Sequence, residues 1–146
     1  MRSLKALRMT ITAPSPLAAS ALVATGGAVG AVARYQVGRA VSHLTGPSNA
    51  FPWGTLSVNL IGSLAMGALL GWFARSSVAA ETAESMRLLI GVGLLGGFTT
   101  FSAFSAELVT MLHRGQMADA AIYGAASLFA GMAALLAGLI IAQSVS

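Results

Sequence analysis

The sequence has 146 residues, of which 8% are charged and 56% are hydrophobic, and its mean hydropathy is +0.81. A soluble domain carries about 25% charged residues, so this composition excludes a disordered chain and argues against a soluble globular one. The chain has no cysteine, two histidines and four acidic residues, which excludes disulfides and thiol catalysis and leaves little for a hydrolytic or metal site. Its net charge of +4 comes from basic residues spread thinly along an apolar chain, which indicates membrane spans with basic flanks and no nucleic-acid partner.

Four charge-free stretches separate the charged clusters. They cover residues 9–33, 40–74, 88–106 and 120–146. About 20 helical residues cross a hydrocarbon core of about 30 Å, so each stretch predicts one spanning helix. We expect an all-α membrane protein with transmembrane helices near 17–39, 53–74, 86–112 and 118–142.

The spans divide the chain into a basic N-terminal tail (1–16), a four-helix transmembrane domain (17–142) and a short C-terminal tail (143–146). Between the helices we expect a turn-rich loop at 40–52, a polar loop at 75–85 and a tight turn at 113–117. None of these connections is long enough for a soluble domain, so we expect the activity to lie within the bilayer.

The basic residues are almost evenly divided between the two sides of the membrane. With four spans, one side holds Arg2, Lys5, Arg8, Arg75 and Arg87, and the other holds Arg34, Arg39 and Arg114. Lysine and arginine asymmetry sets the orientation of a membrane protein. Because the asymmetry here is slight, the sequence predicts insertion in both orientations.

Small residues recur at helical spacing within the spans. Pairs four residues apart are Gly26 with Gly30, Gly67 with Gly71, and Gly93 with Gly97, and the fourth helix carries Gly124, Gly131 and Gly138. Such stripes let helix backbones approach closely. We expect tight helix packing within the bundle or against a second copy.

Polar pairs lie one turn apart on two of the spans. Thr55 and Asn59 share a face of the second helix, and Tyr123 and Ser127 share a face of the fourth. Polar groups in the bilayer need partners, either on neighbouring helices or on something that passes through. The pattern alone leaves both uses open.

The middle of the third span is a poor helix former. Gly96 and Gly97 are followed, after one residue, by the β-branched Thr99 and Thr100. A break here would free backbone carbonyls that could hold a hard cation such as Na⁺. The alternative is a glycine kink in which hydroxyls bond back to the preceding turn, and both remain open.

Phe101 and Phe104 share a face after this segment, and Glu107 lies one turn further on. The edge of an aromatic ring is positive, so two edges turned toward a pathway would attract a small anion without a full charge. The ordinary alternative is that both rings face lipid or core.

These segments together resemble the Fluc/CrcB fluoride channels of bacterial membranes. The resemblance is carried, in the expected order, by residues 27–35, 54–62, 96–104 with Glu107, and Tyr123 with Ser127. It implies a non-enzymatic channel in the inner membrane that exports cytoplasmic fluoride passively. It also implies an antiparallel dual-topology homodimer and a central structural Na⁺ bound by the backbone carbonyls of Gly96 and Thr99 from each copy.

The resemblance further assigns residues to the ion pathway and to its ends. Phe101 and Phe104 would present their edges to fluoride, and the remaining pathway residues would be Asn59, Thr55, Tyr123, Ser127 and Ser102. Arg34 would lie near the vestibule mouth, with Glu107 at the other end of the phenylalanine face. Two positions depart from the family pattern, because Ala103 stands where a threonine is usual and Gly131 stands where a further hydroxyl can extend the track.

Two other classes of protein fit part of the pattern. Small dual-topology multidrug transporters also have four short helices, but they carry an acidic residue within the first helix, and here that helix has none. A structural subunit of a larger membrane complex would use the glycines for packing alone. Flux measurements on the purified protein separate these classes from a channel.

Overall fold

The computed structural model describes residues 14–46 and 51–144. Within these ranges all regular structure is helical, and four helical segments are long and apolar enough to cross a membrane: Pro16–Thr45, Trp53–Arg75, Ala80–His113 and Met117–Ser144. The prediction of an all-α, multi-pass membrane protein with four spans is therefore confirmed.

The first span, α2 (Pro16–Thr45), has a defined start and a defined end. The Ser15 hydroxyl accepts a hydrogen bond from the Ala18 N–H at 3.2 Å, and proline occupies the first turn. Gly46, with φ of 84°, ends the helix. The helix therefore continues through residues 40–45, which we had expected in a loop. The Gly46 N–H donates to the Ser42 carbonyl at 3.2 Å, which continues the helical hydrogen-bond pattern to this end.

The predicted boundaries of the two tails also shift. Residues 1–13 of the basic tail lie outside the described part of the chain, and Pro16 already belongs to α2. The last span, α7 (Met117–Ser144), includes the first half of the expected C-terminal tail, and residues 145–146 are outside the described range. The second span, α3 (Trp53–Arg75), matches its predicted range within one residue.

The third span consists of several segments. They are α4 (Ala80–Met86), the π-helical segment η1 (Arg87–Leu95), α5 (Gly96–Phe98) and α6 (Phe101–His113). Thr99 and Thr100 between α5 and α6 have extended backbone, with φ/ψ of −81°/158° and −149°/116°. The third span starts six residues before its predicted start at residue 86, and its π-helical stretch was not predicted. A tight turn containing Gly115 (φ 76°) then leads into α7.

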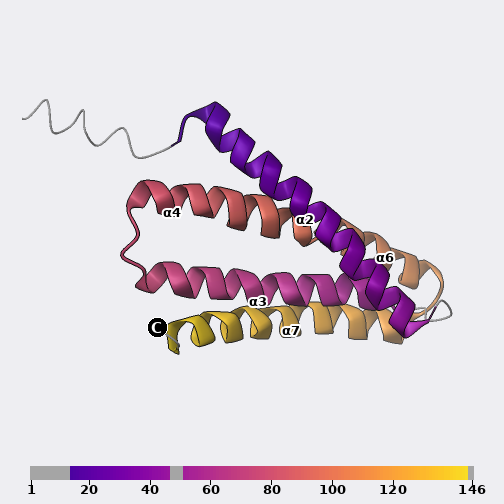
Figure 1. The fold of residues 1–146 in the computed structure, drawn as a ribbon. Helices are drawn as coiled ribbons and strands as arrows, with labels where there is room; N and C mark the ends of the chain where they lie inside the picture. Colours follow the sequence, from indigo (N-terminus) through magenta and orange to yellow (C-terminus); the bar gives the residue numbers. More distant parts are fainter. Residues whose placement is uncertain (1–13, 47–50, 145–146) are drawn as a thin grey trace, which may run out of the picture.

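Spans adjacent in sequence are not the closest partners in space. Figure 1 shows α3 and α7 side by side, whereas α2 crosses η1 and α5 obliquely. A Cβ atom at Gly26 would lie 2.8 Å from the Leu94 backbone nitrogen, and one at Gly67 would overlap the Leu135 carbonyl. These glycines therefore permit backbone contact between α2 and η1 and between α3 and α7, as the sequence predicted.

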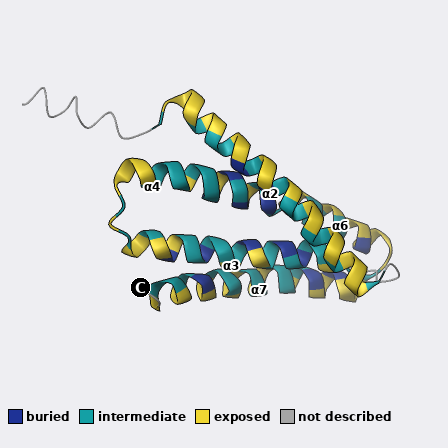
Figure 2. Cartoon of the chain, viewed as in Figure 1, coloured by how far each residue is buried: buried dark blue, intermediate teal, exposed yellow. Residues whose placement is uncertain are grey.

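One cluster of buried hydrophobic residues lies where α3, α6 and α7 meet. This cluster contains Leu56, Met111, Ala120 and Tyr123. Large apolar side chains are exposed on every span, and Figure 2 shows exposed residues along each of the long helices. Such surfaces suit a chain surrounded by lipid or by another copy of itself.

Candidate functional site

The interruption in the third span is held by one side chain from α3. The Thr100 N–H donates to Oδ1 of Asn59 at 2.9 Å, and Nδ2 of Asn59 donates to the Thr100 carbonyl at 3.1 Å. One amide side chain thus satisfies both backbone groups of an extended residue within the membrane, where an unpaired group is costly. Asn59 therefore fixes the position of the break, and one of its two amide protons remains for another acceptor.

The break redirects the carbonyls that precede it. In an uninterrupted α-helix the Thr100 N–H would pair with the Gly96 carbonyl, but here it pairs with Asn59. The Gly96 carbonyl is thereby released from that helical bond. The Thr99 carbonyl accepts a hydrogen bond from Nη1 of Arg34 at 3.3 Å. Both carbonyls are hard oxygen ligands located at the same interruption.

The N-terminus of α6 lies directly after the break. The Thr100 hydroxyl accepts from the Ala103 N–H and lies 3.2 Å from the Ser102 hydroxyl. A helix N-terminus presents unpaired N–H groups and a partial positive charge. The break therefore places hydroxyls and positive partial charge together, next to the Arg34 guanidinium on the Thr99 carbonyl.

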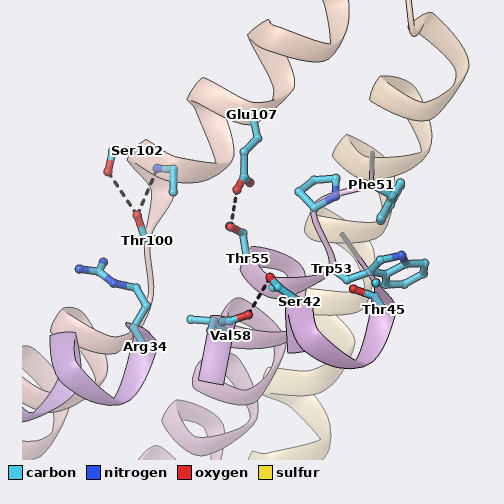
Figure 3. A pocket seen from close by; sticks show the side chains of 15 residues that line it. Arg34, Ser42, Thr45, Phe51, Trp53, Thr55, Val58, Thr100, Ser102 and Glu107 are labelled. Carbon is cyan, nitrogen blue, oxygen red and sulfur yellow. Dashed lines mark hydrogen bonds between the residues drawn. The ribbon is translucent and has the colours of Figure 1, made fainter. Parts of the chain in front are cut away.

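A polar cavity of about 790 Å³ lies on one side of the break. Its walls include Arg34, Thr55, Ser102 and Glu107, which come from α2, α3 and α6. In Figure 3, Arg34 lies on the same side of this cavity as Thr100 and Ser102, and Glu107 points toward Thr55. Arg34 is the one cationic side chain on the described wall of this cavity.

The carboxylate of Glu107 joins three helices. Its Oε1 accepts from the Thr55 hydroxyl at 2.6 Å, and its Oε2 accepts from the Tyr123 hydroxyl at 2.7 Å. Tyr123 has an exposed fraction of 0% and belongs to the buried cluster. Both hydroxyl protons are therefore committed to Glu107, and the Tyr123 hydroxyl stabilises the bundle in the conformation described.

A second cavity, of about 420 Å³, lies on the other side of the break and contains most of the predicted pathway residues. Asn59, Phe101, Phe104 and Ser127 line it, and its described wall carries no charged side chain. The Ser127 hydroxyl oxygen is buried and has no hydrogen-bond partner among the described residues. A buried hydroxyl without a partner has a donor available for something inside the cavity.

The two phenylalanines of α6 differ in exposure. Phe101 is 78% exposed, whereas Phe104 is partly buried against the α3–α6–α7 cluster. Their ring centroids are 5.7 Å apart, and that of Phe104 lies 5.1 Å from that of Tyr123. Phe104 is thus held by a buried neighbour, while Phe101 reaches the surface of the subunit.

The structure brings ten of the eleven predicted site residues together in two groups around the break, whereas the predicted pathway residue Tyr123 lines neither cavity. The polar cavity takes Arg34, Thr55, Ser102 and Glu107, and the second cavity takes Asn59, Gly96, Thr99, Phe101, Phe104 and Ser127. Thr100, which lines both cavities, and Ser63, which lines the second, were not among the predicted site residues. Ser63 follows Asn59 by four residues, as Asn59 follows Thr55, and this spacing is the signal that would have identified it.

Replacing Asn59 with leucine should destabilise the protein by a few kcal/mol, because the Thr100 N–H and carbonyl each lose a partner at a cost of about 1–3 kcal/mol. Thermal unfolding in detergent measures the change. The control is Thr110→Val, since the Thr110 hydroxyl bonds a carbonyl of its own helix. Equal melting of Asn59→Leu and wild type would show that the break needs no support from α3.

Comparison with known proteins identifies the family. Residues 21–139 match the family model described as "CrcB-like protein, Camphor Resistance (CrcB)". The chain is 49% identical over 130 residues to the fluoride-specific ion channel FluC of Novosphingobium aromaticivorans, an alignment covering 89% of this chain and 100% of that protein. It is 52% identical over 119 residues to the protein of the same name from Sphingopyxis alaskensis, covering 82% and 90% of the two chains. The chain therefore belongs to the CrcB-like family.

Proposed function

We propose that this protein is a passive fluoride channel that exports fluoride down its electrochemical gradient and so lowers its concentration in the cytoplasm. The observation that carries the proposal is the second cavity, in which Asn59, two phenylalanine rings and the unpartnered Ser127 hydroxyl meet without a charged side chain. The names of the relatives at about half identity support fluoride as the ion.

The cavity offers what a small, strongly hydrated anion needs in exchange for water. Fluoride accepts hydrogen bonds, and the free amide proton of Asn59 and the hydroxyl of Ser127 donate them. The positive edges of Phe101 and Phe104 add a weaker attraction. Because no charged side chain lines this cavity, no side-chain cation holds the ion tightly and the ion can leave again, which conduction requires.

The polar cavity serves as the vestibule in this proposal. Arg34 supplies a cation that raises the local concentration of anions, and Ser102 and Thr100 supply hydroxyls close to the break. Thr100 lines both cavities, so an anion passes the N-terminus of α6 between them. The Glu107 carboxylate stays hydrogen-bonded to the hydroxyls of Thr55 and Tyr123 and keeps both in place. We call this arrangement the clamp.

We propose that the carbonyls of Gly96 and Thr99 hold a structural Na⁺. Two observations support this site. The Thr100 N–H bonds Asn59 and not the Gly96 carbonyl, so that carbonyl is free, and Gly96 and Thr99 line the same cavity. Two carbonyls from one subunit leave a hard cation with too few ligands, so a second copy would supply the rest. The Arg34 guanidinium occupies one lone pair of the Thr99 carbonyl and leaves the other available.

Exchanging Na⁺ for a larger monovalent cation during purification should shift the protein from dimer to monomer or lower its fluoride flux, because a larger ion fits the same carbonyls poorly. Size-exclusion chromatography with light scattering measures the first effect. A dimer fraction and flux that are independent of the cation would contradict a central Na⁺. All cation arms are run at the same ionic strength, so a difference between them reports the identity of the cation.

We further propose that the subunit forms an antiparallel homodimer in the bacterial inner membrane, with both orientations inserted. The exposed Phe101 ring, which lies beside the second cavity, supports a second copy at this surface. Alkaline phosphatase and green fluorescent protein fused to the C-terminus report on opposite sides of the membrane. We expect both to be active at comparable levels, and activity of only one would contradict dual topology.

Fluoride efflux from liposomes containing the purified protein tests the function directly. A fluoride electrode should record rapid release once a potassium ionophore shunts the charge. Uptake of an organic cation that requires a proton gradient would instead indicate a multidrug transporter. Absence of any flux would indicate a structural subunit.

A further inference from the structure

The polar side chains of α3 form a longer series than the predicted site contains. Thr55, Asn59 and Ser63 follow one another at intervals of four residues, so they lie on one face of the helix. Thr55 lines the polar cavity, and Asn59 and Ser63 line the second cavity. The series therefore runs past the break into the space that the phenylalanines and Ser127 also line.

On α7, which faces α3 across this cavity, Ser127 is not followed by another hydroxyl one turn further on. One turn further along α7 the chain has Gly131, which offers no side chain. A Cβ atom built at Gly131 would lie 3.8 Å from the Ser63 hydroxyl oxygen, an ordinary van der Waals distance. The Ser63 hydroxyl thus lies in the space that the hydroxyl of a serine or threonine at position 131 would reach.

We propose that Ser63 is a further residue of the ion pathway, which donates its hydroxyl to the anion beyond Ser127 in place of the donor that α7 lacks at Gly131. This inference rests on the proposed channel function. One helical turn is about 5.4 Å, so a missing donor would leave an anion without a partner over that distance. With Ser63, the donors alternate between α3 and α7: Asn59, Ser127 and Ser63.

Ser63→Ala should reduce fluoride efflux about tenfold, because a hydrogen bond to a charged partner is strong enough for a change of this size in rate. Ser63→Thr keeps the hydroxyl and should retain most of the flux. The decisive variant is the double mutant Ser63→Ala with Gly131→Ser, which returns a hydroxyl to the same space from the facing helix. Its matched control is Ser63→Ala with Gly131→Ala, which adds a Cβ atom at the same position without a donor.

Recovery of flux in the serine double mutant, and not in its alanine control, would support the proposal. Equal flux in wild type and Ser63→Ala would overturn it, and so would loss of flux that both double mutants fail to restore while thermal unfolding matches wild type. A wild-type protein that releases no fluoride would instead refute the channel function itself. The wild-type measurement therefore separates the two failures.

Discussion

Phe101→Ile and Phe104→Ile should each lower fluoride efflux to the level of protein-free liposomes while leaving the protein folded. Isoleucine preserves apolar bulk but removes the ring and its positive edge. In the proposed pathway this edge attracts fluoride where no hydrogen-bond donor is in reach. Phe104 packs against Tyr123 at 5.1 Å between ring centroids, so its replacement also frees the neighbouring cluster to shift. Electrode recordings of efflux measure the first effect, and thermal unfolding monitors the second.

The matched control is Phe129→Ile. Phe129 lies on α7 and is 67% exposed, but it lines neither of the two cavities described above. We expect this variant to conduct as wild type does. Wild-type efflux in Phe101→Ile and Phe104→Ile would remove the ring edges from the mechanism, whereas a loss in all three variants would point to general damage by isoleucine.

Gly67→Val should destabilise the protein strongly, by about 3 kcal/mol from overpacking. A Cβ atom at Gly67 would overlap the Leu135 carbonyl and lie 2.8 Å from its carbon. The obstacle is backbone, which cannot rotate away as the tip of a side chain can, so α3 and α7 would have to separate. The fraction of protein that remains monodisperse in mild detergent, and its melting temperature, measure the loss.

Gly124→Ala, on the glycine stripe of the fourth span, provides the comparison. The nearest atom to a Cβ there is Cδ1 of Leu108, at 4.0 Å, so a methyl group has room. Alanine also favours a helix by up to about 1 kcal/mol relative to glycine. This variant should be as stable as wild type or more so, and destabilisation of both variants to the same extent would contradict the assignment of Gly67 to a backbone contact.

The architecture follows from properties that act over whole segments. Charge-free stretches of sufficient length require helices in a bilayer, because each backbone group must find a partner within its own segment. The glycine pairs then predicted which helix faces come closest, and the contacts of Gly26 and Gly67 confirm this. Local boundaries were less predictable, since the extension of α2 to Thr45 and the early start at Ala80 depend on bonds that composition does not reveal.

The site was predictable as a set of residues but not as a set of bonds. The segment with Thr99 and Thr100 stands out because glycine and β-branched residues disfavour a helix. Asn59 pairs with both backbone groups of Thr100 only because α3 is positioned along its axis so that the two residues are level. A single sequence does not specify this position. The clamp of Tyr123 on Glu107 depends likewise on the rotation of α7 against α6, which a single sequence does not specify.

The crossed pairing of the spans affects how the protein is made. Gly26 and Gly30 of α2 contact η1 and α5, and Gly67 and Gly71 of α3 contact α7. During synthesis, α2 and α3 therefore enter the bilayer before these partner segments have left the ribosome. Each must persist in lipid without its glycine-face partner, so the bundle closes only when the C-terminal helix has been inserted.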